Sequence, residues 1–288
     1  MSWRIYHLEY ELLSPLHVGY HKVGNVQRTR YYLPARNLWG AMTERLTRSG
    51  FTLEVGIPPG DYQRVGQWLR AHCAFGYLFI CRDDQPLYPC YSPRGLRYGD
   101  WAEAAFERRY LATHVTTALD PASTSAQAES LHEVEYIAPY DREGRRTCMG
   151  GWVWLDEVAH ERLAANNWRD WPTELQVGGE RRYGFGRLRL RRSPAEDHDL
   201  PAGYQFNGDG GRPRLSTEGG KPLLAHTLVD SVSARGMIEP LVGREAEGDS
   251  DRFGQRVTAA CLTWMPGSIT STDTQLIVDS WGTWRAAS

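Results

Sequence analysis

Lysine is almost absent from this 288-residue chain. Only Lys22 and Lys221 are lysines, so 31 of the 33 basic residues are arginine. Arginine carries a planar fork of donors that fits phosphate and stacks on bases, which suits a protein that binds RNA. A GC-rich genome also favours arginine codons, so the bias alone does not decide between these explanations. The positions of the arginines are therefore more informative than their number.

The chain also lacks paired cysteines and long apolar runs. Its five cysteines include no CxxC motif, which argues against a disulfide framework and a zinc knuckle and suits a reducing compartment. No run of about twenty apolar residues is present, so we expect no membrane span and no membrane partner. The N-terminal residues lack the apolar segment of a signal peptide, so we expect a cytoplasmic protein.

The hydrophobic periodicity predicts a mixed α+β fold. In chain order, we predict a strand over 3–13, a strand and a helix over 31–50 with Asn37 as N-cap and Ser49-Gly50 at its end, a helix around 62–72, a strand over 75–82, hairpin arms around 114–118 and 131–137, a strand over 148–157, a helix over 158–168 capped by Asp156, and a strand from 187. Residues 19–30 and 85–99 are predicted to be loops.

This order matches a ferredoxin-like (RRM-like) βαββαβ domain over residues 1–195, with a long thumb-like β-hairpin insertion at about 85–147. Such a domain presents an open sheet face, which is a common platform for RNA. Glycine, proline and charged residues dominate 193–220, which predicts a linker or boundary. Residues 196–288 are then a β-rich C-terminal extension, with strand-like runs at 257–264 and 275–281.

The segment VGGERRYGFGRLRLRR, residues 177–192, is the most distinctive feature. It is not a P-loop, because GK[ST] is missing, and it is not a dinucleotide fingerprint, because the third glycine is missing and a strand follows. We expect its glycines to let backbone N–H groups approach phosphate while its arginines supply charge and an aromatic stacks on a base. The alternative is a glycine-rich turn beside a solvated basic strand. The expected RNA-binding residues are Gly178, Gly179, Arg181, Arg182, Tyr183, Gly184, Phe185, Gly186 and Arg187.

A second basic group lies at the transition from the first strand to the first helix. Helix N-termini attract anions, so this transition is a candidate phosphate site. For His17, a packed histidine bonded to backbone is as good an explanation as a nucleic-acid contact. The residues expected to bind RNA here are His17, Lys22, Arg28, Arg30, Arg36 and Asn37, together with His114 on the hairpin.

Four segments occur in an order that resembles the RAMP superfamily, the ferredoxin-like subunits of CRISPR effector complexes. They are SPLHVG, YYLPARNLWGAMTERL, the long hairpin THVTTALDPASTSAQAESLHEVEYI and VGGERRYGFGRLRL, and the resemblance spans most of residues 3–192. The resemblance implies a guide (CRISPR) RNA-binding subunit of a type III-like effector in a prokaryotic cytoplasm. Its partners would be the guide RNA, neighbouring RAMP backbone subunits and a large polymerase-like subunit, with target RNA contacted only indirectly. The hairpin at 113–137 would be the thumb, and 196–288 a degenerate second RAMP-like half.

One departure from the family bears on catalysis. Backbone subunits that cut target RNA carry an aspartate in the loop before the first helix, but YHKVGNVQRTRYYL, residues 20–33, contains no acid. Metal-assisted cleavage needs a carboxylate, so we expect no catalytic residue, no metal and no cofactor. Residues 234–269 resemble the C-terminal ends of subunits that cap the filament at the 5′ tag of the guide, which favours that role.

Three alternatives stay open at the level of sequence. The chain could be a backbone subunit that has lost cleavage. It could be the metal-independent repeat-processing endoribonuclease of the superfamily, with His17, His21 or His114 as general base. A scaffold without an RNA role fits least well, because it leaves the arginine cluster at 181–192 unexplained.

Overall fold

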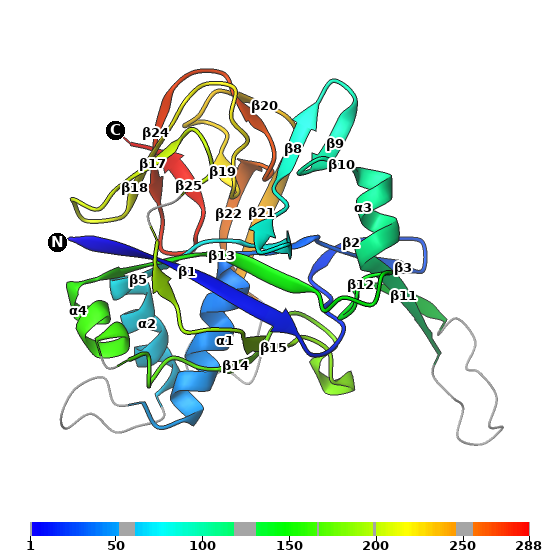
Figure 1. The fold of residues 1–288 in the computed structure, drawn as a ribbon, viewed down its shortest axis with the longest axis horizontal. Coiled ribbons are helices and arrows are strands. Elements are labelled where there is room, and N and C mark those ends of the chain that lie inside the picture. The colour runs from blue at the N-terminus through cyan, green and yellow to red at the C-terminus, as the bar shows by residue number, and fades with distance from the viewer. Residues whose placement is uncertain are drawn as a thin grey trace.

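A computed structural model describes residues 2–51, 61–117, 131–165, 167–197, 200–245 and 256–287. The fold is mixed α and β and consists mostly of strands, as predicted (Figure 1). The helices are α1 (Ala35–Arg48), α2 (Tyr62–His72), α3 (Glu103–Tyr110) and α4 (Glu157–Ala159), and α4 continues into a π-helical turn, η1 (His160–Ala164). No helix within the described ranges is long and apolar enough to cross a membrane.

The central sheet is built on two long antiparallel strands, β1 (Trp3–Leu12) and β13 (Cys148–Asp156), which pair from Trp3↔Asp156 to Glu11↔Cys148. Both confirm the predicted strands. The sheet order is β14-β15-β1-β13-β6-β4, and every neighbouring pair is antiparallel. The other strands are β4 (Tyr32–Leu33), β6 (Leu78–Arg82), β14 (Glu174–Gln176) and β15 (Arg187–Leu190), while β5 (Cys73–Phe75), β7 (Gln85–Pro86) and β16 (Ala195–Glu196) pair along its edges. The four principal strands in chain order are β1, β6, β13 and β15. In the sheet they lie side by side in the order fourth, first, third, second.

Helices α1, α2 and α4 cover one face of this sheet (Figure 1), whereas α3 packs with the strands of the insertion. The predicted inner face of α1 is buried, and Ser49-Gly50 ends the helix as expected, with Gly50 at φ +72°. The N-cap is Pro34 rather than Asn37, because the fixed φ of proline suits the start of a helix. Asp156 caps α4 as predicted, by accepting from the N–H of Ala159 at 2.9 Å. The helical segment ends after Ala164, earlier than predicted, since left-handed backbone follows within four residues.

The C-terminal region covers much of the opposite face. Its seven-stranded sheet has the order β17-β18-β24-β25-β19-β22-β21, and it lies above the central sheet in Figure 1. Tyr204, Leu215 and Trp284 meet Trp152 and Trp154 of β13 around a small apolar gap. The strands are β17 (Tyr204–Asn207), β18 (Arg214–Thr217), β19 (Thr227–Leu228), β21 (Ile238–Glu245), β22 (Arg256–Trp264), β24 (Thr274–Val278) and β25 (Trp284–Ala286), with β20 (Ala234–Arg235) paired to β23 (Ile269–Thr270).

This packing corrects two expectations. Residues 193–220 are not simply a linker, because β16, β17 and β18 form within them and β16 pairs with β1 of the central sheet. The predicted open sheet face is not free over its whole area, because aromatic side chains of the C-terminal region pack on it. The predicted strands at 257–264 and 275–281 correspond to β22 and β24. The division of the chain at residue 195 stays a prediction.

The insertion contains more structure than predicted. Residues 85–99 are not a loop: β8 (Pro89–Ser92), β9 (Gly95–Tyr98) and β10 (Trp101–Ala102) form a small sheet, and Tyr98 stacks on Phe106 of α3 with ring centroids 4.1 Å apart. Residues 19–30 are likewise a hairpin, β2 (Gly19–Val23) and β3 (Val26–Thr29), rather than a loop. Aromatic packing and turn glycines, rather than alternation, stabilise these short strands.

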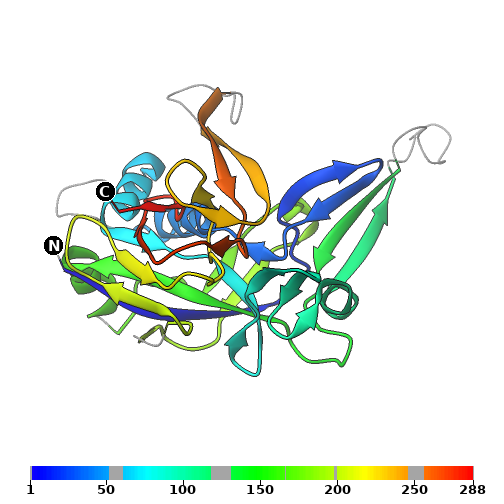
Figure 2. The same ribbon diagram turned by 90° about the horizontal axis from the view of Figure 1, so that it is seen from above.

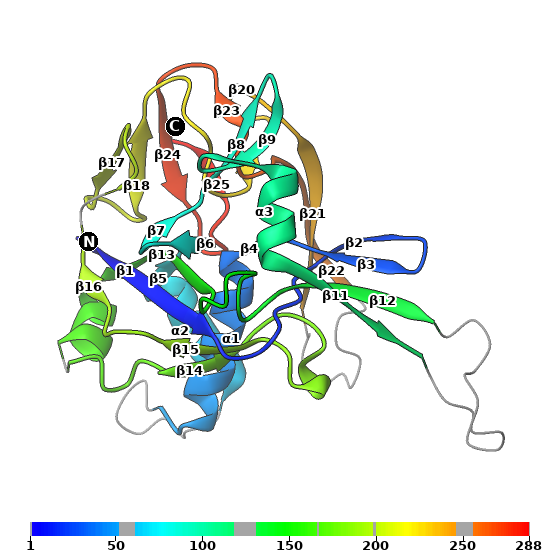
Figure 3. The same ribbon diagram turned by 45° about the vertical axis from the view of Figure 1, so that its right-hand side comes forward.

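The thumb arms are confirmed as β11 (Leu111–Thr116) and β12 (His132–Ile137), which pair antiparallel up to Thr116↔His132. The middle of the predicted hairpin, 118–130, lies outside the described residues. β12 also pairs in parallel with β3, so the thumb and the β2–β3 hairpin form one four-stranded sheet. Both hairpins project from the same side of the molecule (Figures 2 and 3).

Candidate nucleic-acid interface

The glycine loop, residues 177–187, connects β14 to β15 and is seated on the SPLHVG turn. The N–H of Gly179 donates to the carbonyl of His17 at 2.8 Å, and the N–H of Gly186 donates to the carbonyl of Pro15 at 2.7 Å. The Gln176 side chain donates to the carbonyls of Arg181 and Phe185, at 3.0 Å each. The loop is therefore a well-braced turn that closes over a short 3-10 helix, η2 (Arg181–Tyr183).

The glycines serve this packing. A Cβ atom on Gly178 would overlap the carbonyl of His17, and one on Gly186 would overlap the carbonyl of Val177. Gly184 has open space around it and is required only for its φ of +83°. Because the N–H groups of Gly179, Gly184 and Gly186 donate to protein carbonyls, we leave them out of the proposed phosphate contacts.

The turn presents two side chains to solvent. Arg182 is exposed, and no carboxylate partner is found for it within the described parts of the chain. Tyr183 is 78% exposed, the largest value among the large hydrophobic side chains. Its neighbour Arg181 is held by an ion pair of 2.9 Å to Glu44 of α1. Phe185 points inward and packs against Tyr136 of the thumb at 5.6 Å between ring centroids, so it joins the loop to the thumb base.

The arginines that follow, on β15 and directly after it, are in a different situation. Arg187 and Arg189 both lie within ion-pair distance of Glu174, and Arg189 also of Glu11. Arg191 binds Glu9 and, at 2.8 Å, Asp84, while Arg192 binds the second oxygen of Glu9 at 3.2 Å. The carboxylates come from β1, β14 and the β6–β7 turn, so the sequence gives no local signal for them. These arginines are largely neutralised.

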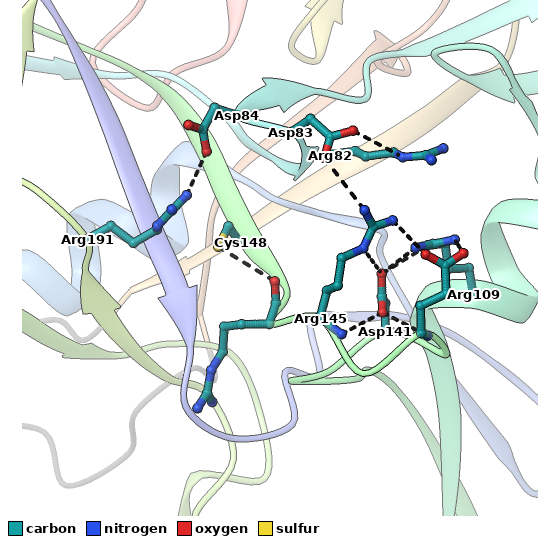
Figure 4. Close-up of polar contacts among 10 residues, drawn as sticks. Arg82, Asp83, Asp84, Arg109, Asp141, Arg145, Cys148 and Arg191 are labelled. Atoms are coloured by element: carbon teal, nitrogen blue, oxygen red, sulfur yellow. Dashed lines mark hydrogen bonds and ion pairs between the residues drawn. The ribbon is translucent and has the colours of Figure 1, made fainter.

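The end of the sheet face beside Arg191 forms a cleft of about 280 Å³ with both signs of charge. Figure 4 shows its walls: Asp83 and Asp84 occupy a left-handed turn, and Arg145 lies between Asp83 and Asp141. Burial by itself raises the pKa of Asp141, but hydrogen bonds from the Arg145 N–H and from Arg109 hold that pKa below its usual value. The charges of this cleft satisfy one another, so it does not favour an anion.

The residues of the strand-to-helix segment separate into exposed and buried groups. Lys22 is exposed on β2. Arg28 is half-exposed and pairs with Glu107 and Glu135 of the thumb region. Arg36 stacks on Trp281 at 4.7 Å, and Asn37 lies in the first turn of α1.

Arg30 belongs to a buried network instead. It pairs with Glu239 at 2.8 Å, and Glu239 also binds Nε2 of the fully buried His226 at 2.6 Å. The hydroxyl of Tyr77 lies 2.7 Å from Nδ1 on the other side of the His226 ring. Burial lowers the pKa of His226, so the neutral ring donates from Nε2 to the carboxylate and accepts the Tyr77 hydroxyl. Arg30 therefore links the N-terminal and C-terminal regions, and we leave it out of the proposed interface.

The histidines differ in access. His17 is 5% exposed, and its Nδ1 lies 2.7 Å from the carbonyl of Glu135, which matches the packed alternative. His21 and His114 are exposed on β2 and β11. Among the described residues, no group of three or more His, Cys, Asp or Glu side chains is arranged to hold a metal.

Solved chains that resemble this fold include two from one kind of complex. Both come from cryo-electron microscopy structures of the type III-B Cmr-beta, one bound to cognate target RNA and AMPPnP and the other to cognate target RNA. Each has a TM-score of 0.56 and 13% sequence identity over 92% of this chain, covering 85% and 86% of the respective chains. No protein-family model and no curated protein matches the sequence. The chain thus shares the fold of those chains along almost its whole length.

Proposed function

We propose that this protein is a non-catalytic, guide (CRISPR) RNA-binding subunit of a type III-like CRISPR interference complex. The observation that carries the proposal is the braced turn that presents Arg182 and Tyr183 beside the base of the projecting thumb. The fold shared with type III-B Cmr-beta chains supports it. The strand order fourth, first, third, second supports a ferredoxin-like, RAMP-type reading of the N-terminal region.

In this proposal the side chains, rather than the glycine N–H groups, contact the RNA. Arg182 donates charge-assisted hydrogen bonds to backbone phosphate, and Tyr183 offers a face on which a base stacks. Lys22 on the neighbouring hairpin adds a phosphate contact, and His114 lies on the thumb strand beside Phe185. Because phosphate contacts dominate, the affinity falls as salt rises.

The finer role we propose is the cap of the filament at the 5′ tag of the guide. The C-terminal region supports it, because its described strands close much of the sheet face. The side of the molecule with the glycine loop and the two hairpins then remains open to RNA. The alternative within the family is a backbone subunit that has lost cleavage. Reconstitution with the sibling subunits distinguishes them, since a cap is present once per complex and contacts only the 5′ end in crosslinking.

The apolar face of β21 and β22 supports assembly with protein partners. Ile238 and Val242 on β21 and Leu262 on β22 are each about half or more exposed. The register places Pro240 opposite Leu262 and Val242 opposite Ala260, so the alternate positions from Ile238 to Val242 and the residues opposite them are uncharged. Such a face suits a neighbouring protein subunit, either a RAMP backbone subunit or the large polymerase-like subunit, rather than RNA.

The decisive experiment measures binding of a labelled single-stranded guide RNA by the full chain across a salt series. We expect the double variant R182A/Y183A to bind about tenfold or more weakly, because it loses one phosphate contact and one stacked base. The matched control is Arg94→Ala, an exposed arginine between β8 and β9. These two strands lie at the top of Figure 1, whereas β14 and β15 lie near the bottom. Equal binding by the double variant and the control would refute the role of the loop.

The endoribonuclease alternative has a separate test. A metal-independent nuclease needs an accessible histidine at the RNA, which leaves His21 and His114 as candidates because His17 is buried. Repeat RNA is incubated with the protein in EDTA. We expect intact RNA, whereas a discrete product that disappears in His21→Ala or His114→Ala would replace the proposal by the nuclease.

A further inference from the structure

A second group of arginines lines a hollow at the C-terminal end of α1. The hollow has a volume of about 410 Å³, and its walls include Arg45, Arg162 and Arg169, with Asp170 as the single acid among the described residues that line it. The three arginines come from three separate elements: α1, the π-helical turn η1 and the turn that follows it. None of them stands out in the sequence, because Arg45 is far along the chain from Arg162 and Arg169.

The guanidinium groups differ in how they are held. Arg162 is positioned by Asp170 at 3.5 Å and by the ring of Phe51, over which its guanidinium lies at 4.6 Å from the centroid. Arg45 and Arg169 are exposed, and neither has a carboxylate partner within the described ranges. Two uncompensated positive charges thus face one hollow beside a third that is fixed, which is the opposite of the neutralised arginines on β15.

The backbone around the hollow is unusual. Asn167 and Trp168 both adopt left-handed conformations, with φ of +53° and +57°, and such a conformation is strained for tryptophan. Trp168 is anchored by edge-on contacts with Tyr6 at 4.9 Å and with Trp171 at 5.2 Å. The turn directs the chain so that the next residue, Arg169, lines the hollow. Strained turns and π-helical turns both concentrate at functional sites.

The hollow and the glycine loop lie at opposite ends of one short strand. Thr173 lines the hollow, β14 follows, and the glycine loop begins after Gln176. Three residues of strand span about 10 Å. Helix α1 joins the two places as well, since Glu44 holds Arg181 of the loop and the adjacent Arg45 lines the hollow. An extended chain of phosphates that leaves Arg182 along this edge reaches the hollow.

We propose that this hollow is a second phosphate-binding site, which takes a backbone phosphate of the RNA strand held at the glycine loop. Guanidinium groups from three directions suit a tetrahedral phosphate, whereas a planar carboxylate is satisfied by one bidentate fork. The nearby aromatics Trp171 and Phe51 are buried, so the site binds phosphate without stacking a base and without sequence preference. The inference rests on the proposed RNA-binding function for its source of phosphate.

The test uses the full chain and the double variant R45A/R169A, with Arg94→Ala as control and R45K/R169K to keep the charge. A labelled single-stranded RNA long enough to pass both sites is titrated over a salt series. We expect R45A/R169A to bind several-fold more weakly and to lose about 0.7 from the slope of log affinity against log salt, the share of one single-strand phosphate. The lysine variant should keep most of the slope but lose part of the affinity. A slope equal to that of Arg94→Ala overturns the inference while leaving the role of the loop intact.

A second arm separates the hollow from the proposed function. Thermal unfolding is followed with inorganic phosphate and, separately, with a polyglutamate peptide at matched ionic strength. We expect phosphate to raise the melting temperature of the wild type and of Arg94→Ala but not that of R45A/R169A. If the wild type binds no RNA but phosphate raises its melting temperature, the hollow is a site for a free phosphate group. If phosphate does not raise the melting temperature of the wild type, the hollow is not a phosphate site. A shift produced by polyglutamate in preference to phosphate also overturns the inference, in favour of an acidic protein segment.

Discussion

The two halves of the segment 177–192 contain the same residue type in opposite electrostatic situations. On the turn, Arg182 is exposed beside Tyr183 without a carboxylate partner in the described structure, while Arg191, directly after the strand that follows, binds both Glu9 and Asp84. Glu9 is almost completely buried in the sheet, so its charge requires the arginines around it. The turn offers charge to a ligand, and the strand uses its charge to complete the fold.

This difference shows how a charge cluster in sequence can mislead. The acids near 196–199 are separated from the arginines along the chain, which favoured an uncompensated basic patch. In the fold, Glu9 and Glu11 lie on β1 and Glu174 lies on β14, the two strands that pair with β15. Their carboxylates neutralise the arginines, although they are not sequence neighbours of those arginines. Only the part of the cluster that leaves the sheet keeps its charge available.

The largest effect is expected from a substitution that disrupts the glycine loop itself. In Gly186→Ala, the new Cβ would overlap the Val177 carbonyl at a φ of +77°, so we expect a loss of about 3 kcal/mol or more in the free energy of unfolding, and loss of RNA binding. Gly184→Ala is the matched control: its φ is also positive, but the space is open, so about 1 kcal/mol is expected. Urea denaturation measures both. Equal losses would show that the close approach of Gly186 to the Val177 carbonyl does not determine the stability of the loop.

The second prediction compares alanine substitutions of Arg191 and Arg182 in their effects on stability and on RNA binding. Arg191→Ala leaves the buried Glu9 with only Arg192, so we expect the free energy of unfolding to fall by about 2 kcal/mol with RNA affinity nearly unchanged. Arg182→Ala should do the reverse, with unchanged stability and about fivefold weaker RNA binding, close to 1 kcal/mol. Paired denaturation and filter-binding curves test the contrast. An Arg191→Ala variant that is stable but fails to bind RNA would place the interface on the strand.

The smallest effect extends the comparison to Arg30, whose partner Glu239 also binds His226. Burial lowers the pKa of His226, so the folded state stays neutral while the unfolded state takes up a proton near pH 6.5. Stability should therefore fall as the pH drops below 6.5, by at most about 1.4 kcal/mol per pH unit from this one group. His226→Gln should flatten that dependence in melting curves between pH 7.5 and 5.5. An unchanged pH profile would mean that His226 is already protonated in the fold.

Much of the fold follows from local patterns. The alternation of residues 3–13, the apolar face of residues 38–46 and the capping aspartate Asp156 predicted β1, α1 and the start of α4 because these signals act over a few neighbouring residues. The thumb arms follow from β-prone runs on either side of a polar middle. The short strands at 85–102 and 204–217 were missed because their stability comes from packing partners distant in the chain.

The site divides in the same way. The sequence by itself determined that a glycine-rich, arginine-rich turn would precede the last strand of the βαββαβ order, since glycine is the residue that adopts positive φ without strain. It did not determine which arginines stay available, why Gly178 and Gly186 are needed, or that Arg45 and Arg169 meet at one hollow. Those outcomes depend on which carboxylates, carbonyls and guanidinium groups the tertiary structure brings within a few ångströms. Electrostatic pairing and steric overlap act over distances in space rather than along the chain, so only the folded structure decides them.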